Sequence, residues 1–411
     1  MKTIAITVLM LMAFSGLSSA DQTLMIFGNA NMDGTIDQDD VSYLEGIISG
    51  KLEKTNLSDA DCDGKIDQKD VQQVSAIISG KAESISLIDG SGRTVTVKTP
   101  VQSAVPLNMR HACALVVLGG EDQVTGVDET VVERRALFPN LSTRQSVGKV
   151  KEPDVEKIIS LHPDLVLTFT NSPLPELLES KLPKSTAVVR YDLSRAASVE
   201  TEMRALGYLL GHQKKAEEYL KWYRETMDMV ESRAADIPDG EHVRVFMERE
   251  MKSATGPSVR WAYANGTGYT DLCELAGGIN IAAGQIAYNG DLETEYVISE
   301  DPEVIIGLSY QGGYKDGNRT AMEAYRHQIS GVLGFEGTAA VKDGRVHIIS
   351  GDFSIGPQLP LGAAAVARWL YPDLFEDLNT AELHRRFLTD FMGVSFDPEK
   401  DGVFCYPAEG C

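Results

Sequence analysis

The sequence predicts an α/β protein with two α/β lobes joined by a long helix, preceded by a small all-α domain built from a duplicated loop–helix unit. Three observations lead to this fold class. Residues 29–40 are repeated at 59–70, strand and helix patterns alternate through most of the remaining chain, and residues 156–169 (EKIISLHPDLVLTF) are echoed by residues 295–308 (EYVISEDPEVIIGL). Alternation of strands and helices favours parallel sheets. A duplicated helix–Pro–strand unit predicts two similar lobes with a ligand cleft between them. Chance similarity of two helix–strand joins is the alternative.

Residues 1–20 have the pattern of a secretory signal peptide. Lys2 precedes an apolar run from Ile4 to Leu17, and the small residues 18–20 predict cleavage after Ala20. The apolar run is short for a membrane span, and no Cys follows it directly as a lipid-anchor signal requires. We therefore expect an exported, extracytoplasmic protein that is soluble or held at the cell surface by other means.

Length and charge narrow the functional classes. A chain of 411 residues exceeds what one core usually covers, and a net charge of −22 argues against nucleic acid and anionic membranes as partners. Five cysteines cannot all pair internally. Cys405 and Cys411 could form a disulfide after export, whereas Cys62, Cys113 and Cys273 have no predicted partner.

The small domain, residues 21–82, contains two calcium-loop patterns. NANMDGTIDQDD and DADCDGKIDQKD place oxygen-bearing side chains at loop positions 1, 3, 5, 9 and 12, with Gly at position 6 and a backbone carbonyl at position 7. An acidic, turn-rich repeat without metal is the alternative. The first loop has two Asn where the second has Asp, so we expect it to bind calcium more weakly. The predicted ligands of two Ca²⁺ ions are Asn29, Asn31, Asp33, Thr35, Asp37 and Asp40, then Asp59, Asp61, Asp63, Lys65, Asp67 and Asp70, with Thr35 and Lys65 acting through their carbonyls.

Position 12 is Asp, and a single helix follows each loop, so these are not ordinary EF-hands. Residues 27–82 resemble the type I dockerin throughout. The resemblance implies calcium-dependent folding and binding to a cohesin-bearing surface protein. In dockerins, loop positions 10 and 11 often set cohesin preference, and here they are Gln38-Asp39 and Gln68-Lys69.

The remaining chain divides into a first lobe (83–197), a joining helix (198–238), a second lobe (239–393) and a tail (394–411). A hairpin turning at Asp89-Gly90 opens the first lobe, in which strands SAVPLN, VTGV, DLVLTF and TAVVRYDL alternate with helices. Residues 198–236 read as helix, interrupted at most near Gly211. The second lobe begins at VRVFMERE, repeats the alternation and ends with a helix over residues 381–392.

Three further segments carry a second resemblance: DLCELAGGINIA (271–282), AVKDGRVHIISGDF (340–353) and ARWLYPDLFEDL (367–378). Together with the joining helix, they make residues 86–391 similar to the class III periplasmic binding proteins of ABC importers. That family serves ferric siderophores, haem, cobalamin and metal ions. The runs AGG, GRV and YPDLF favour the iron-chelate branch, and only seven His argue against the branch that binds bare divalent metal ions.

The resemblance also implies site residues. Glu156 and Glu295, which head the internal echo, are expected to dock onto an ABC permease, although each could simply favour a helix N-terminus. Arg110 could instead only start a helix, Arg249 could pair with Glu248 or Glu250, and Trp261 and Tyr263 could be strand packing. Gln358 follows Gly-Pro where iron-chelate members often have Arg, which weakens the expectation of a strongly anionic ligand. The expected ligand-binding residues are Asn108, Met109, Arg110, Arg249, Trp261, Tyr263, Tyr310, Asp352 and Phe353.

These features predict a non-enzymatic receptor that captures an Fe(III) chelate between its lobes and delivers it to an ABC permease. No G-x-S-x-G sequence, nucleotide-binding Gly loop or persuasive Cys–His pair points to catalysis. The alternatives are a receptor for cobalamin or haem, and a dockerin-borne assembly module without a role in transport.

Overall fold

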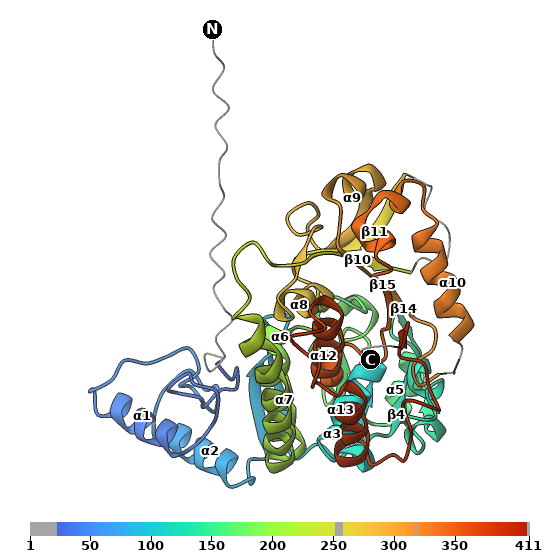
Figure 1. Cartoon of the computed structure of the whole chain (residues 1–411). Coiled ribbons are helices and arrows are strands. Elements are labelled where there is room, and N and C mark those ends of the chain that lie inside the picture. The colour runs from blue at the N-terminus through green and yellow to red at the C-terminus, as the bar shows by residue number, and fades with distance from the viewer. Residues whose placement is uncertain (1–22, 251–257, 316, 318, 409–411) are drawn as a thin grey trace.

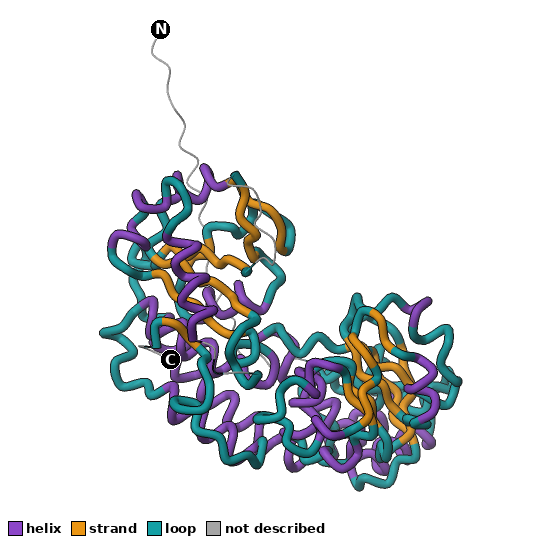
Figure 2. Tube along the Cα trace, turned by 90° about the vertical axis from the view of Figure 1, so that its right-hand side faces the viewer, coloured by secondary structure: helices purple, strands orange, loops and turns teal. Residues whose placement is uncertain are grey.

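The structure, a computed structural model, describes residues 23–250, 258–315, 317 and 319–408. The loop–helix unit lies at one side of the molecule next to α7, and the two α/β lobes lie on the other side (Figure 1). Strands of the two lobes lie at opposite ends, with helices between them (Figure 2). No helix in the described ranges is both long and apolar enough to cross a membrane. The predicted signal peptide lies outside the described residues.

The N-terminal unit contains two equivalent helices, α1 (Gln38–Ile48) and α2 (Gln68–Ile78). Each begins at an Asp N-cap, and the Asp at the third helical position completes a capping box. The fourth loop residues, Met32 and Cys62, both have a left-handed backbone, with φ of 60° and 58°. The 30-residue repeat of the sequence is therefore also a repeat of backbone conformation.

This unit is joined to the first lobe through a small antiparallel sheet. Strands β1 (Ser84–Ile88) and β2 (Thr94–Lys98) form the predicted hairpin, and Ile26 pairs with Leu87 on its free edge. Leu24 and Ile26 are fully buried in the same hydrophobic core as the first lobe. The N-terminal unit therefore shares a core with the rest of the chain.

The first lobe is built on the parallel sheet β3-β8-β9. The short strands β4 and β5 pair in parallel, and β6 and β7 pair antiparallel. The elements are β3 (Ala104–Pro106), α3 (Met109–Val117), β4 (Gly126–Val127), α4 (Glu129–Val132), β5 (Gln145–Ser146), β6 (Gly148–Lys149), β7 (Glu152–Pro153), α5 (Val155–Ser160), β8 (Leu165–Thr168) and β9 (Ala187–Arg190).

The internal echo of the sequence is a structural repeat. Helix α5 leads to β8 in the first lobe, and α9 (Thr294–Glu300) leads to β14 (Val304–Ser309) in the second. His162 and Asp301, which precede the two prolines, both adopt positive φ, at 49° and 45°. The predicted helix–Pro–strand unit is confirmed in both lobes, down to this unusual residue conformation.

The predicted long joining helix is instead two helices, α6 (Ala196–Leu210) and α7 (Gln213–Ala234). Gly211 ends α6 in the left-handed conformation, at φ 76°. Arg204 pairs with Glu217 and Arg224 with Glu200, so the two helices run antiparallel as a hairpin. A Cβ at Gly207 would lie 2.7 Å from Ala216 Cβ, which shows how closely they pack.

The second lobe contains a mixed seven-stranded sheet, which corrects the expectation of an all-parallel one. Strands β10, β14 and β15 are parallel, whereas β11, β13 and β16 run antiparallel to their neighbours. The chain between β10 and β11 is too short for a parallel crossover. The elements are β10 (Arg244–Arg249), β11 (Val259–Tyr263), α8 (Gly268–Leu275), β12 (Ile279–Asn280), β13 (Asn289–Glu293), α10 (Arg319–Ser330), α11 (Ala339–Lys342), β15 (Val346–Ser350), α12 (Leu359–Leu370), α13 (Thr380–Arg386) and β16 (Cys405–Tyr406).

The predicted tail is partly a strand of this sheet, because β16 pairs with β15. Cys405 is disulfide-bonded, and its predicted partner Cys411 lies outside the described residues. Cys62, Cys113 and Cys273 are free thiols.

Candidate ligand site and calcium loops

Three predicted ligand residues share one face of the second-lobe sheet. Glu248 of β10 lies opposite Ala262 of β11, and directly opposed residues of an antiparallel pair point to the same face. Because side chains alternate along a strand, Arg249, Trp261 and Tyr263 all project from the other face. The strand pairing, rather than any motif, gathers them.

Tyrosine side chains continue this surface. The rings of Tyr263 and Tyr269 lie 4.6 Å apart, and the Tyr263 and Tyr310 hydroxyls are 3.4 Å apart. The guanidinium carbon of Arg249 lies 5.1 Å from the centre of the Tyr310 ring, a cation–π contact. Tyr310 is 42% exposed and Tyr288 is 49% exposed, so part of the cluster is open to solvent.

Tyr269 was not predicted as a site residue. Its hydroxyl is buried next to Ser354, and burial raises its pKa. Tyr269 belongs to the first turn of α8, and this helix starts in close contact with the first lobe. A Cβ added at Gly268, the first residue of α8, would lie 2.0 Å from the carbonyl oxygen of Ser194 in the first lobe. The cluster therefore lies where the two lobes meet.

The first lobe contributes Arg110. Asn108 caps α3 by accepting a hydrogen bond from the Arg110 backbone N–H, and Met109 is buried. The Arg110 guanidinium lies 5.6 Å from the centre of the Phe169 ring. A Cβ added at Gly356 of the second lobe would lie 3.3 Å from Arg110 Cγ. Arg110 therefore lies against the second lobe in addition to starting a helix.

Neither Arg110 nor Arg249 has an ion-pair partner among the described residues. The alternative partners of Arg249 are otherwise engaged: Glu248 pairs with Arg260, and Glu250 accepts a hydrogen bond from Ser309. Among the described residues, the buried Arg249 Nε and the buried Trp261 indole N–H have no hydrogen-bond partner. Buried donors of this kind favour a ligand that supplies acceptors.

Two predicted ligand residues lie in the interior instead. Asp352 is 5% exposed and pairs with Arg134 of the first lobe at 2.8 Å, and Phe353 is 1% exposed. Both follow β15, where the chain turns inward to start α12. Gln358, at the position that often holds Arg, is also buried and accepts a hydrogen bond from the Tyr314 hydroxyl. We therefore leave Asp352 and Phe353 out of the proposed ligand set.

The two Glu residues that head the structural repeat are solvent-exposed. Glu156 lies in the first turn of α5 on the first lobe, and Glu295 in the first turn of α9 on the second. Negative charge there is favourable to the helix dipole. Exposure on separate lobes also leaves both carboxylates available to a partner.

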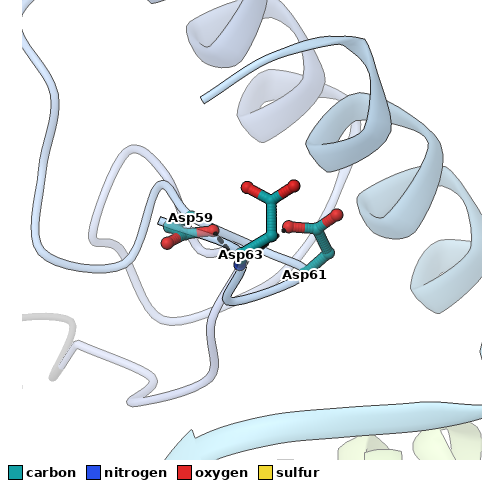
Figure 3. A group of neighbouring side chains, drawn as sticks. All are labelled: Asp59, Asp61 and Asp63. Carbon is teal, nitrogen blue, oxygen red and sulfur yellow. Dashed lines mark hydrogen bonds between the residues drawn. The ribbon is translucent and has the colours of Figure 1, made fainter. Parts of the chain in front are cut away.

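The second of the two predicted calcium loops gathers three carboxylates. Oxygen atoms of Asp59, Asp61 and Asp63 lie within 4.8 Å of one another, the only such group of metal-ligating side chains in the described part of the chain (Figure 3). Asp63 also accepts a hydrogen bond from the Lys69 ammonium at 3.0 Å, and this ion pair lowers the pKa of the Asp63 carboxyl. Three carboxylates this close together repel one another, and a hard cation bound between them would remove that repulsion.

In the first loop the acidic residue at position 12, Asp40, is fully buried, and burial raises its pKa to about 6. Its carboxylate accepts the backbone N–H groups of Asn31 and Asp37. Asn29 is also fully buried, and its amide donates to the carbonyls of Leu24 and Asp33. The first loop thus has amides, Asn29 and Asn31, where the second has the carboxylates of Asp59 and Asp61.

Comparison with known families now identifies the larger part of the chain. Residues 107–352 match the family model of the periplasmic binding proteins. The chain belongs to this family. Solved structures share its fold. The TroA-like periplasmic binding protein FepB from Veillonella parvula superposes with a TM-score of 0.64 at 19% identity, covering 78% of this chain and 98% of that one.

Two curated relatives of this periplasmic binding protein are informative. The ABC transporter substrate-binding lipoprotein YvrC of Bacillus subtilis is 25% identical over 295 residues, 70% of this chain and 86% of YvrC. A cobalamin-binding protein of Halobacterium salinarum is 26% identical over 230 residues, 53% of this chain and 57% of that protein. The first is named for substrate binding in an ABC transporter, and the second for binding cobalamin.

Proposed function

We propose that this periplasmic binding protein captures an Fe(III) chelate, such as a siderophore, between its lobes and delivers it to an ABC permease. The observation that carries the proposal is a pair of guanidinium groups near the junction of the lobes: Arg249 contacts the tyrosine cluster, Arg110 lies against the second lobe, and neither has an acidic partner among the described residues. Arginine binds carboxylate and catecholate oxygens through charge-assisted bonds, and tyrosine rings offer flat faces to aromatic groups.

The proposal predicts that Arg249→Gln weakens binding of a ferric chelate by at least about tenfold, since a hydrogen bond to a charged group contributes roughly 1.5–3 kcal/mol. Tryptophan fluorescence of the full chain, titrated with ferric catecholate, ferric hydroxamate, haem and cobalamin, measures this. Trp261 lies on the proposed site, whereas Trp222 and Trp369 are buried, so Trp261→Phe identifies the reporting residue. Arg385→Gln is the matched control, because the Arg385 side chain of α13 is 41% exposed.

Unaltered affinity of Arg249→Gln for a chelate that binds the wild type would contradict the placement of the site. The second candidate substrate is cobalamin, favoured by the Halobacterium relative. Saturable quenching by cobalamin, without a response to ferric chelates, would establish it.

Delivery is separable from capture. We propose that Glu156 and Glu295 contact the permease, so the double variant Glu156→Lys/Glu295→Lys should keep its ligand affinity but lose most uptake in cells that carry the cognate permease. Glu176→Lys, an exposed charge reversal elsewhere on the first lobe, is the control.

We further propose that the loop–helix unit binds two Ca²⁺ ions and attaches the receptor to a cohesin-bearing surface protein, in the manner of a dockerin. Calcium would be held by the oxygen-bearing residues of loops 29–40 and 59–70, and would neutralise the clustered carboxylates of the second loop. Chelation of calcium should release the receptor from the cell surface. Full retention after chelation would contradict this attachment, and would favour an anchor elsewhere in the chain.

A further inference from the structure

The two calcium loops differ in what surrounds them. In the second loop Asp61, Asp63, Gly64 and Lys65 are exposed. In the first loop Ile36, at position 8, is 4% exposed because helix α6 covers it. The two loop sequences are similar, so the difference in their solvent exposure comes from the fold.

Two side chains of α6 hold the backbone of the first loop. The Tyr208 hydroxyl accepts a hydrogen bond from the Ile36 N–H at 3.0 Å and donates to the Ile36 carbonyl at 3.2 Å. The Arg204 guanidinium donates to the Gly34 carbonyl at 2.9 Å. Residues 204 and 208 are one helical turn apart, so both lie on the α6 face that meets the loop.

These bonds flank the atom that the calcium pattern uses. Thr35 lies between Gly34 and Ile36, and its carbonyl is the predicted ligand at position 7. Both neighbouring residues are held by α6 through hydrogen bonds, so the orientation of the Thr35 carbonyl depends on the helix. Arg204 is in turn 6% exposed and paired with Glu217 of α7 at 2.7 Å.

We propose that Tyr208 and Arg204 are positioning residues for calcium in the first loop, which couples metal binding there to the α6–α7 hairpin. The inference rests on the proposed calcium function. Because coupling between two sites is reciprocal, calcium in the first loop would also stabilise the hairpin. The N-terminal unit is then a docked part of the receptor rather than a swinging tether.

Calcium titration calorimetry of the full, chelator-treated chain tests this. Asp61→Ala removes a ligand of the second loop, so that the first loop can be measured in that background. There, Tyr208→Phe should weaken calcium binding about five- to tenfold, because both hydrogen bonds between the hydroxyl and Ile36 are lost. Tyr296→Phe is the matched control, because it deletes a hydroxyl that donates to the Ile281 carbonyl at 3.0 Å in the second lobe.

With the second loop intact, Tyr208→Phe should leave the tighter of the two calcium sites unchanged. Equal weakening of both sites would overturn the proposal, since it would indicate general loosening of the unit. Unchanged affinity of the first loop would overturn the coupling while leaving calcium binding established. Absence of calcium binding by the wild type would overturn both. Arg204→Lys, which keeps the charge beside Glu217, gives a second test if Tyr208→Phe folds poorly by circular dichroism.

Discussion

Replacement of Arg134 by Met should lower the free energy of unfolding by about 3–5 kcal/mol, because it leaves the carboxylate of Asp352 buried without its cation. The two side chains are 8% and 6% exposed, and their 2.8 Å bond joins the first lobe to the second. Asp352 would keep only weaker neutral donors, such as the Tyr314 backbone N–H at 3.3 Å. Equilibrium unfolding in urea at fixed calcium concentration measures the loss.

The double variant Arg134→Met/Asp352→Leu separates the charge from the contact. With both charges absent, no ion is left unpaired, and most of the lost stability should return. Arg385→Met, which breaks solvent-exposed pairs with Glu382 and Glu399, should change stability little and serves as the control. A double variant as unstable as Arg134→Met would show that shape, not charge, makes this contact important.

This ion pair also illustrates what the sequence could not predict. Arg134 and Asp352 are far apart in the chain, and a GRV-containing motif suggested only that Asp352 lines the ligand site. Tyr269 was missed for a similar reason: it belongs to the site because α8 starts against the first lobe, and no local pattern records that contact. Side chains that meet only because the two lobes pack together have no characteristic spacing in the sequence, so no sequence pattern predicts their contact.

Local signals were read more successfully. The helix–Pro–strand echo and the repeated loop–helix unit are encoded within short segments, and the backbone repeats in both, as the paired positive φ angles show. The prediction of a joining helix was correct only in part, because it depends both on the local sequence and on long-range packing. Gly211 was noted as a point of interruption, but whether the chain continues or reverses there depends on Gly207 and Ala216 packing closely across the hairpin. The tail was unassigned because β16 is only two residues long.

A second large effect concerns Glu202 of α6, a residue that is 6% exposed and whose carboxyl accepts a hydrogen bond from the Leu193 backbone N–H at 2.8 Å. Burial, with a smaller contribution from the charge of Asp192, raises its pKa from 4.5 to about 8. The folded protein therefore holds a proton that the unfolded chain releases near pH 4.5. The associated stability is fully present below that pH and is lost as pH rises through about 8.

Glu202→Gln should remove this pH dependence, because the amide resembles the protonated carboxyl and does not ionise. Each pKa unit corresponds to about 1.4 kcal/mol, so the variant should become more stable than the wild type by on the order of 4 kcal/mol as pH rises from 5 to 9. His111, whose pKa is lowered to about 4, responds equally in both proteins and cancels in the difference. Glu218→Gln, where Lys215 lowers the carboxyl pKa, should give a small effect of opposite sign. Urea unfolding across this pH range measures the difference, and a constant offset between Glu202→Gln and wild type would show that Glu202 is already ionised in the folded protein at pH 5.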